Sequence, residues 1–481
     1  MPHTNAMEEQ LKPVEGISTE DWAATPPSVR TLVLIQFQQL ATLGQRVLDL
    51  EQRLNQTSQN SSKPPSSDPS SAPPRPQKVP RGRQAGGQVG HQGSTRQRRE
   101  PDEIVECRPS DCPHCQSVLA PDLPDVAPVI VTQVWELPLL RPIITDYQQH
   151  TVCCPECTAR VTAPAPPDAT TGYGSRVAAL CGHLHGTYHL SYRAIADLLA
   201  DVADLPIGLA SVVTSCQRLS AALLPIDAAL QTALQNEKVV NVDETGWREQ
   251  GKRCWLWVAT SANLTCFRIS PGRGRAGLDL LLDLTYPGII GSDRWNAYNR
   301  YSDQQRQLCW AHLLRNVRGL AEGGMRESSW ADGLLKQIET LFRVWHRFRD
   351  GAIDRAGLQR EMTPIQQAIQ QALHEGKSKH WHKIVTLSNE LVSHWAALWT
   401  FVSEEGVEPT NNRAERVLRP AVIWRKQCFG TQSADGSRFV ERILSVVTTC
   451  RQQKRNVWSF LTQAITAARA GLPAPALLPS P

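Results

Sequence analysis

Apolar residues recur every seven positions near the start of the chain. The repeat occupies Val33, Leu40, Val47 and Leu54, with Leu43 and Leu50 between them. This spacing predicts a coiled-coil-like helix over residues 28–55. Gln36 and Gly44 interrupt the pattern, so the helix either pairs with a second copy or packs on its own protein.

A polar stretch follows at residues 56–100. Its first part is mainly Ser, Pro and Asn, which cannot bury enough surface to offset chain entropy, so we expect a disordered linker. Between Lys78 and Arg99 there are six Lys or Arg and no acid. Such a basic arm can neutralise DNA phosphates, and the alternative is a solvated cationic linker.

Residues 101–166 carry two cysteine pairs with metal-binding spacing. The pairs are Cys112-Pro-His-Cys115 and Cys154-Pro-Glu-Cys157. Four thiolates can hold one structural Zn²⁺ tetrahedrally, and we expect the segment at 129–152 to supply the strands of a zinc-ribbon-like hairpin. The spare candidates are Cys107, Cys153 and His114.

The pattern becomes helical over residues 170–235. It predicts a helix, a turn around residues 205–208 and a second helix. This could be a helix-turn-helix whose second helix enters a DNA groove, but the turn is long and few basic residues line that helix. A helical packing domain is the alternative.

Alternating and β-branched residues mark a different fold from residue 236 onward. A run at 239–243 ends on Asp243, and a second run at 288–293 ends on Asp293. Between them the pattern predicts an antiparallel hairpin of 254–260 with 264–270 and a helix at 272–284. Strand, hairpin, helix and strand open a ribonuclease-H-like fold, in which the first and fourth strands are neighbours. Asp243 and Asp293 should therefore meet.

A third acid, Glu415, lies far along the chain. Helical spacing fills residues 321–405, which predicts an all-helical insertion between a first core part at 236–320 and a final part at 406–465. We expect Thr410 or Asn411 to cap a helix that carries Glu415 in its first turns and stops at Pro420. The tail at 466–481 has no periodicity and should be disordered.

Three crowded carboxylates repel one another unless a cation neutralises them. Oxygen-only ligation suits Mg²⁺ or Mn²⁺, and two such ions roughly 3.5–4 Å apart can clamp the attacking and leaving oxygens of a phosphodiester. The arrangement indicates phosphoryl transfer on nucleic acid. Glu244, next to Asp243, could share its role.

Composition narrows the class of protein only modestly. The net charge of +5 is too small to indicate DNA binding by itself. There is no signal-like N-terminus and no apolar run of the roughly 18 residues that a membrane span needs, so we expect an intracellular protein outside the membrane. Paired cysteines favour metal ligation over disulfides.

The sequence NNRAERVLRP at 411–420, followed by WRKQCFGT at 424–431, resembles the DDE transposases of the insertion-sequence-66 family. NSSKPPSSD and GGQVGHQG in the linker resemble the same family, and Cys309-x-x-His312 resembles a C/D-x-x-H motif of many DDE transposases. The resemblance implies a bacterial, nucleoid-associated enzyme in which Asp243, Asp293 and Glu415 hold two Mg²⁺. It would cut the ends of a mobile element and join the freed 3′-hydroxyl to target DNA.

The implied partners are element-end and target DNA, further copies of the chain and accessory proteins encoded by the element. The expected DNA-contacting residues are Arg273, Arg275, Arg416, Arg419, Arg425 and Lys426. The run GRGRAG at 272–277 lacks the Lys-Ser/Thr ending of a nucleotide-binding loop, so no nucleotide cofactor is expected. The alternatives are a non-catalytic regulatory derivative and a ribonuclease-H-like nuclease.

Overall fold

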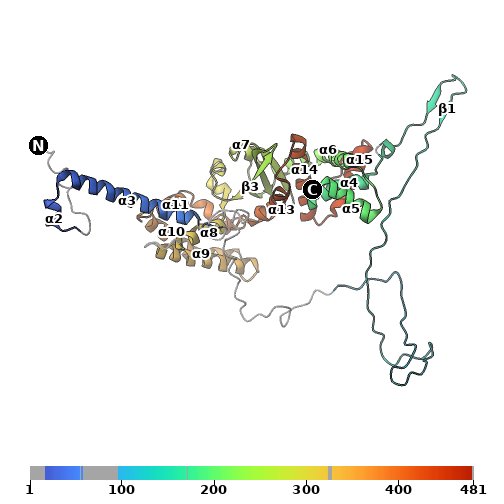
Figure 1. Cartoon of the computed structure of the whole chain (residues 1–481), viewed down its shortest axis with the longest axis horizontal. Coiled ribbons are helices and arrows are strands. Elements are labelled where there is room, and N and C mark those ends of the chain that lie inside the picture. The colour runs from blue at the N-terminus through green and yellow to red at the C-terminus, as the bar shows by residue number, and fades with distance from the viewer. Residues whose placement is uncertain (1–16, 55, 58–95, 171, 323–327, 479–481) are drawn as a thin grey trace. The chain divides into compact units, whose positions relative to one another are not determined.

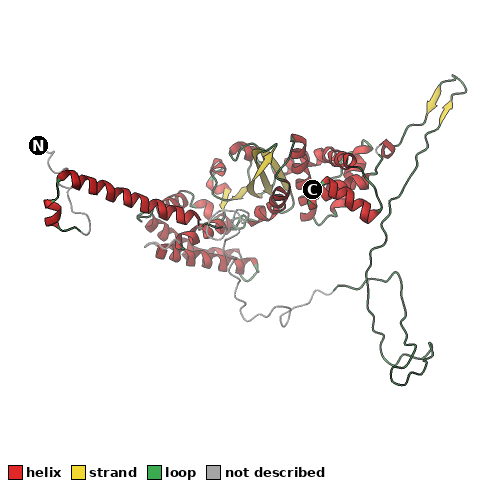
Figure 2. Ribbon diagram, viewed as in Figure 1, coloured by secondary structure: helices red, strands yellow, loops and turns green. Residues whose placement is uncertain are grey.

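The computed structural model describes residues 17–54, 56–57, 96–170, 172–322 and 328–478 (Figure 1). Contacts divide the chain into two units, of which one combines residues 74–146 with 196–208 and the other contains the rest. Helices predominate, together with a two-stranded and a five-stranded sheet (Figure 2). The predicted linker at 56–100 lies mostly outside the described residues.

The N-terminal heptad segment is helical. Helix α2 (Thr19–Ala24) begins at Ser18, whose hydroxyl accepts a hydrogen bond from the Asp21 N–H, and α3 follows as Pro27–Leu54. Leu40, Leu43 and Leu50 on α3 are each more than half exposed. The predicted helix is therefore present, and its pairing with a second copy stays a prediction.

The cysteine region contains less strand than predicted. Strands β1 (Thr151–Cys153) and β2 (Arg160–Thr162) pair antiparallel around the second cysteine pair. Residues 128–150 form no strand, although they are described. Apolar side chains such as Val129, Ile130 and Ile143 are exposed there, so no packed face favours pairing. A short 3₁₀ turn, η3 (Pro167–Thr170), follows.

Helices α4 (Ser175–Tyr188), α5 (Tyr192–Ala203) and α6 (Leu209–Leu234) come next. Helix α6 packs on α4 and on two C-terminal helices, α14 (Ala434–Gln452) and α15 (Val457–Arg469). By length and composition alone α6 could cross a membrane, but Leu219, Leu223 and Leu230 are fully buried in this packing. The second helix of the predicted helix-turn-helix therefore has a buried face, and its entry into a DNA groove stays a prediction.

The central sheet has the order β5-β4-β3-β6-β7. Its strands are β3 (Val239–Glu249), β4 (Lys252–Thr260), β5 (Thr265–Ser270), β6 (Ile289–Ser292) and β7 (Arg306–Leu308). Strands β3, β4 and β5 are antiparallel neighbours, and β3, β6 and β7 are parallel. The first and fourth strands are adjacent, as predicted.

Two elements of this sheet region differ from the expectation. Strand β3 does not end at Asp243, because residues 244–249 continue the antiparallel pairing with β4. The helix expected at 272–284 is reduced to α7 (Arg275–Asp279). Gly277 of α7 lies so close to the Trp257 ring that a Cβ atom would be 2.2 Å from the ring nitrogen, so this short helix packs tightly on the sheet.

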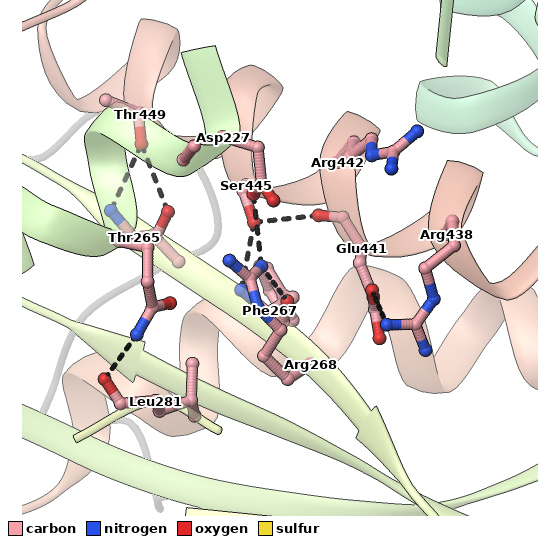
Figure 3. A network of polar contacts seen from close by, with 12 residues as sticks. Asp227, Thr265, Phe267, Arg268, Leu281, Arg438, Glu441, Arg442, Ser445 and Thr449 are labelled. Carbon is pink, nitrogen blue, oxygen red and sulfur yellow. Dashed lines mark hydrogen bonds and ion pairs between the residues drawn. The ribbon is translucent and has the colours of Figure 1, made fainter. Parts of the chain in front are cut away.

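Helix α14 covers the free edge of β5 with hydrogen-bonding side chains (Figure 3). The N–H groups of Thr265, Phe267 and Ile269 point to this edge. They donate to Thr449 Oγ1 at 3.1 Å, Ser445 Oγ at 2.9 Å and Glu441 Oε1 at 2.6 Å. Alternate strand residues thus meet every fourth helix residue, and the edge is satisfied without another strand.

The insertion is helical throughout its described residues. Short turns η4 (Asn296–Arg300) and η5 (Asp303–Gln305) precede β7. The helices are α8 (Trp310–Ala321), α9 (Ser328–Arg349), α10 (Arg355–Gly376), α11 (His382–Ser393), η6 (Ala396–Leu398) and α12 (Thr400–Ser403). They share one hydrophobic core with Leu308 of β7, and Val239 and Ile289 at the starts of β3 and β6 pack against it.

Helix α13 (Asn412–Cys428) continues past Pro420, where we had predicted its end. Proline removes one backbone donor from the helix, but contacts with β3 and β4 hold the segment. Ala414, Leu418, Ala421 and Trp424 form its buried face.

The C-terminal tail also differs from the prediction. Helix α15 extends to Arg469, and Leu477 beyond it is 3% exposed. The Arg455 guanidinium donates a hydrogen bond to the Ala476 carbonyl at 2.9 Å. The described tail therefore begins as helix, and its irregular part is anchored at Leu477.

Candidate active site

Asp243 and Asp293 have matching positions relative to two neighbouring parallel strands. Val240 pairs with Ile290 and Asn241 with Gly291, and each acid lies two residues further along the chain, Asp243 within β3 and Asp293 directly after the end of β6. Asp243 shares a face of β3 with Trp247, whose ring contacts Trp424 of α13. Sheet alternation thus turns Asp243 toward the helix that carries Glu415.

Asn411 fixes the start of that helix against β3. Its side-chain amide donates to the Val242 carbonyl at 2.8 Å, and its Oδ1 accepts from the Asn241 amide at 3.0 Å. Its own N–H donates to Cys309 Sγ at 3.1 Å. Asn411 is the predicted N-cap residue, but it makes no capping side-chain bond. It instead connects the start of the helix that carries Glu415 to β3, which carries Asp243, and to Cys309 after β7.

The acids influence one another electrostatically. Burial raises the pKa of Asp243 well above its usual value, and the nearby carboxylates of Glu244, Asp293 and Glu415 raise it further. Burial also raises the pKa of Asp293, while the Trp295 N–H, which donates to Asp293 Oδ1 at 2.8 Å, and the positive charge of Arg273 oppose this. A cation placed among these groups would relieve the repulsion.

The donor chemistry fits a hard divalent ion, since Asp243, Asp293 and Glu415 offer carboxylate oxygens only. Within the residues that the structure describes, however, no three such side chains converge closely enough to form a metal cluster. Glu415 Oε1 is bound instead by Arg315 Nη2 at 3.2 Å and lies 3.5 Å from His312 Nε2.

His312 and Cys309, the two residues of the C-x-x-H motif, both lie near this acid. Burial lowers the pKa of His312 to about 3, and the charges of Arg315 and Arg294 lower it in the same direction, so the imidazole is neutral. Burial raises the pKa of Cys309 to about 11, so its sulfur is a thiol. The pair therefore adds no charge to the acidic pocket, and Cys309 acts through Asn411.

The loop after Asp293 is held from two sides. Arg294 forms an ion pair with Glu390 of α11, and the Trp295 ring nitrogen donates to the Arg273 carbonyl at 2.8 Å. Sequence reasoning missed Arg294 and Arg315. The available signals were an arginine directly after the second acid and another on the helical turn after His312.

Glu244 has a different environment from Asp243. It lies on the opposite face of β3, where the Arg273 guanidinium binds its Oε1 at 2.7 Å and the Tyr298 hydroxyl donates to its Oε2. Arg273 also stacks on Trp295 with its guanidinium carbon 4.1 Å from the ring centroid. Glu244 is therefore already paired with a cation of the chain, and Arg273, predicted to contact DNA, also holds this pair and the Trp295 ring.

The other predicted DNA-contacting cations divide into two groups. Arg425 donates to the Gly246 carbonyl of β3 and is half-buried. The exposed ones are Arg275, Arg416, Arg419 and Lys426. Within the described part of the chain these four form no ion pair, so their charges are available to a partner.

The two cysteine pairs have the same backbone turn. In the first, the Cys112 N–H donates to Ser117 and the Gln116 N–H to Cys112, at 2.9 and 2.8 Å. In the second, the Cys154 N–H donates to Ala159 and the Thr158 N–H to Cys154, at 2.8 and 2.9 Å. Hydrogen bonds lower the pKa of Cys115, chiefly from Ser117, and of Cys154, chiefly from the Cys157 backbone.

Comparison with known proteins matches two regions of the chain. Residues 171–438 match the model of the transposase IS66 family, and residues 23–97 match a family of unknown function, DUF6444. An uncharacterized protein, y4qI, from Sinorhizobium fredii (strain NBRC 101917 / NGR234) is 27% identical over 248 residues, which cover 46% of this chain. The match spans 45% of that relative, a little less than half its length.

Proposed function

Because the chain belongs to the transposase IS66 family, we propose that it cuts and rejoins DNA by phosphoryl transfer with Asp243, Asp293 and Glu415 as its DDE triad. The observation that supports this proposal is the parallel pairing of β3 with β6, after which Asp243 and Asp293 follow at matching positions, together with the hydrogen bond from the Asn411 side chain that ties the start of α13 to β3. Its substrates would be element ends and target DNA in the bacterial cytoplasm.

The topology supports a ribonuclease-H-like core. The order β5-β4-β3-β6-β7 places the third, second, first, fourth and fifth strands of the core next to one another, with an antiparallel half and a parallel half. In such a sheet the adjacent first and fourth strands each present one acid. The helical insertion then lies between the second acid and the third in sequence.

Asp243, Asp293 and Glu415 would hold two Mg²⁺ or Mn²⁺ ions. Bound there, such ions supply charge neutralisation at the attacking and leaving oxygens of a phosphodiester. The chain's own groups keep the third acid in place, since Arg315 binds Glu415 and the neutral His312 packs beside it without competing for the ions as a second charge.

The DNA backbone would follow the exposed cations of α13. Arg416, Arg419 and Lys426 lie on the helix that carries Glu415 in its first turn, so phosphates bound to them are led to the acids. Arg275 would add a contact from α7.

We also propose one structural Zn²⁺ held by the two cysteine pairs, Cys112 with Cys115 and Cys154 with Cys157. The support is the shared backbone turn, in which the residue after the second cysteine, Gln116 or Thr158, takes a left-handed conformation. Paired Cys-x-x-Cys turns of this kind present two thiolates each to a tetrahedral ion.

The decisive experiment compares wild type with Glu415→Ala for Mg²⁺-dependent nicking and joining of element-end DNA. We expect Glu415→Ala to lose both activities while it still binds the DNA. Equal activity of the two proteins would overturn the triad. Glu244→Gln is a useful companion, because Glu244 faces away from α13 and should not be needed for the ions.

A further inference from the structure

The outer face of α13 is a basic stripe that ends in an exposed aromatic ring. Arg416, Arg419, Ile423 and Lys426 follow one another at helical spacing and are all exposed, with Ile423 at 47%. Phe429 closes the helix and is 76% exposed. We call these five residues the α13 stripe.

Phe429 adopts a backbone conformation that bulky residues rarely take. Its φ is +60° and its ψ is 11°, which is the left-handed region in which glycine or asparagine usually ends a helix. Of the described non-glycine residues with positive φ, Phe429 is the one with a large apolar side chain. A bulky side chain there costs strain that some other interaction must offset.

A second helix of the chain ends in the same way and shows what the offset can be. His189 closes α4 with a φ of +61°, and its ring stacks on Trp424 with centroids 5.1 Å apart. Phe429 has no ring contact within the described residues. No ring contact among the described residues therefore accounts for an aromatic residue at position 429.

The backbone around Phe429 is fixed. A Cβ atom at Gly430 would lie 2.2 Å from the Arg248 carbonyl, and the Thr431 N–H donates to that same carbonyl at 2.9 Å. Thr431 in turn accepts the Gln250 N–H at 2.8 Å. The ring is thus presented from a rigid corner between α13 and the β3–β4 hairpin.

We propose that Phe429 is a wedge that inserts between base pairs of duplex DNA bound along the α13 stripe. The exposed positive charges select a polyanion, and an apolar side chain beside them matches the way in which many proteins kink DNA. Fourteen residues separate Phe429 from Glu415, or about 21 Å of helix. The wedge therefore acts about six base pairs from the phosphate held at the acids, measured along straight DNA. This inference rests on the proposed action on DNA.

The test uses the full chain and a duplex of about 30 base pairs with a fluorescent dye at each end and flexible pyrimidine–purine steps in the middle. Binding of wild type should shorten the distance between the dyes. Phe429→Asn keeps a residue that tolerates the left-handed conformation, so its thermal unfolding temperature should equal or exceed that of wild type. Its DNA affinity should fall about tenfold, the scale of one lost base–aromatic stack, and the shortening should disappear.

Two controls separate the wedge from charge and from surface hydrophobicity. Lys426→Gln should lower the dependence of log affinity on log salt by about one while the DNA is still bent, whereas Phe429→Asn should leave that dependence unchanged. Leu472→Ala removes a side chain that is 62% exposed elsewhere and should change neither quantity. Wild-type affinity and bending in Phe429→Asn would overturn the proposal. So would dissociation of a DNA-free oligomer by Phe429→Asn, because Phe429 would then cover a protein interface.

The inference and the proposed function can fail separately. Glu415→Ala should bend DNA as wild type does and lose nicking. If Glu415→Ala retains nicking while Phe429→Asn loses bending, the triad is wrong and the wedge stands. If Phe429→Asn bends DNA normally while Glu415→Ala loses nicking, the wedge is wrong and the triad stands.

Discussion

Replacing Asn411 by alanine should destabilise the protein more than any substitution of an exposed residue on α13. Asn411 is 1% exposed, and its side chain joins Val242 and Asn241 by two hydrogen bonds. Asn411→Ala leaves both partners unpaired in a buried place. Each buried group left without a partner costs about 1–3 kcal/mol. Because Val242 lies in a paired strand, we expect the two groups together to cost about 2–4 kcal/mol, toward the lower end of the summed range.

The matched control is the neighbouring residue. Asn412 is exposed, and Asn412→Ala should cost under about 0.5 kcal/mol. Urea unfolding followed by tryptophan fluorescence gives both values. A double-mutant cycle of Asn241→Ala with Asn411→Ala should show a coupling of about 1 kcal/mol. Because the same bonds hold Glu415 near β3, half-maximal nicking should need more Mg²⁺ in Asn411→Ala. Equal stability of the Asn411 and Asn412 variants would refute the conclusion that Asn411 holds the start of α13 on β3.

Three further outcomes are expected. Burial raises the pKa of Glu441 from 4.5 to about 7, so the folded state holds a proton that the unfolded state has lost between those pH values. The free energy of unfolding should therefore fall by about 3 kcal/mol as the pH rises through this window. Urea unfolding at several pH values measures this fall, which should be smaller in Glu441→Gln. The same pH dependence in wild type and Glu441→Gln would contradict the argument. Cys157→Ser should remove the one Zn²⁺ per chain found by atomic absorption, whereas Cys107→Ser should retain it; metal-free wild type excludes the site. If α3 pairs with a second copy, Leu43→Asp should lower the mass of the oligomer measured by light scattering, and Gln38→Asp should leave it unchanged. An unchanged mass in Leu43→Asp would mean that α3 packs on its own chain instead.

The order of the core elements could be predicted because each short β-branched run gives an unambiguous strand signal. Once the order strand, hairpin, helix and strand is recognised, the right-handed crossover places the fourth strand beside the first, which carries Asp243. The extent of β3 could not be predicted. Residues 244–249 include Glu244, Thr245, Gly246 and Arg248, which have little β pattern of their own, and they are extended because β4 pairs with them.

The arrangement around Glu415 was the least accessible to sequence reasoning. Asparagine before a helix indicates a cap. Nothing in the neighbouring sequence distinguishes a cap from the hydrogen bonds that Asn411 forms with residues about 170 positions earlier. Pro420 likewise reads as a helix stop, and only the packing of Leu418, Ala421 and Trp424 on the sheet keeps the helix going. The strand expected at 129–150 is absent for a different reason, since apolar residues there such as Ile130 and Ile143 are exposed.

The side chains of α14 along β5 also determine how this protein can assemble. Four helix residues rise about 6.0 Å and two strand residues about 6.7 Å, so helix and strand drift apart by about 0.7 Å at each step. Over three consecutive hydrogen bonds this mismatch stays small, whereas over a longer series of bonds it would become too large. The short length of β5, six residues, agrees with this limit. Because that edge is occupied, a second copy or a peptide cannot add a strand beside β5. Copies that gather on one DNA molecule must therefore meet through surfaces other than this one.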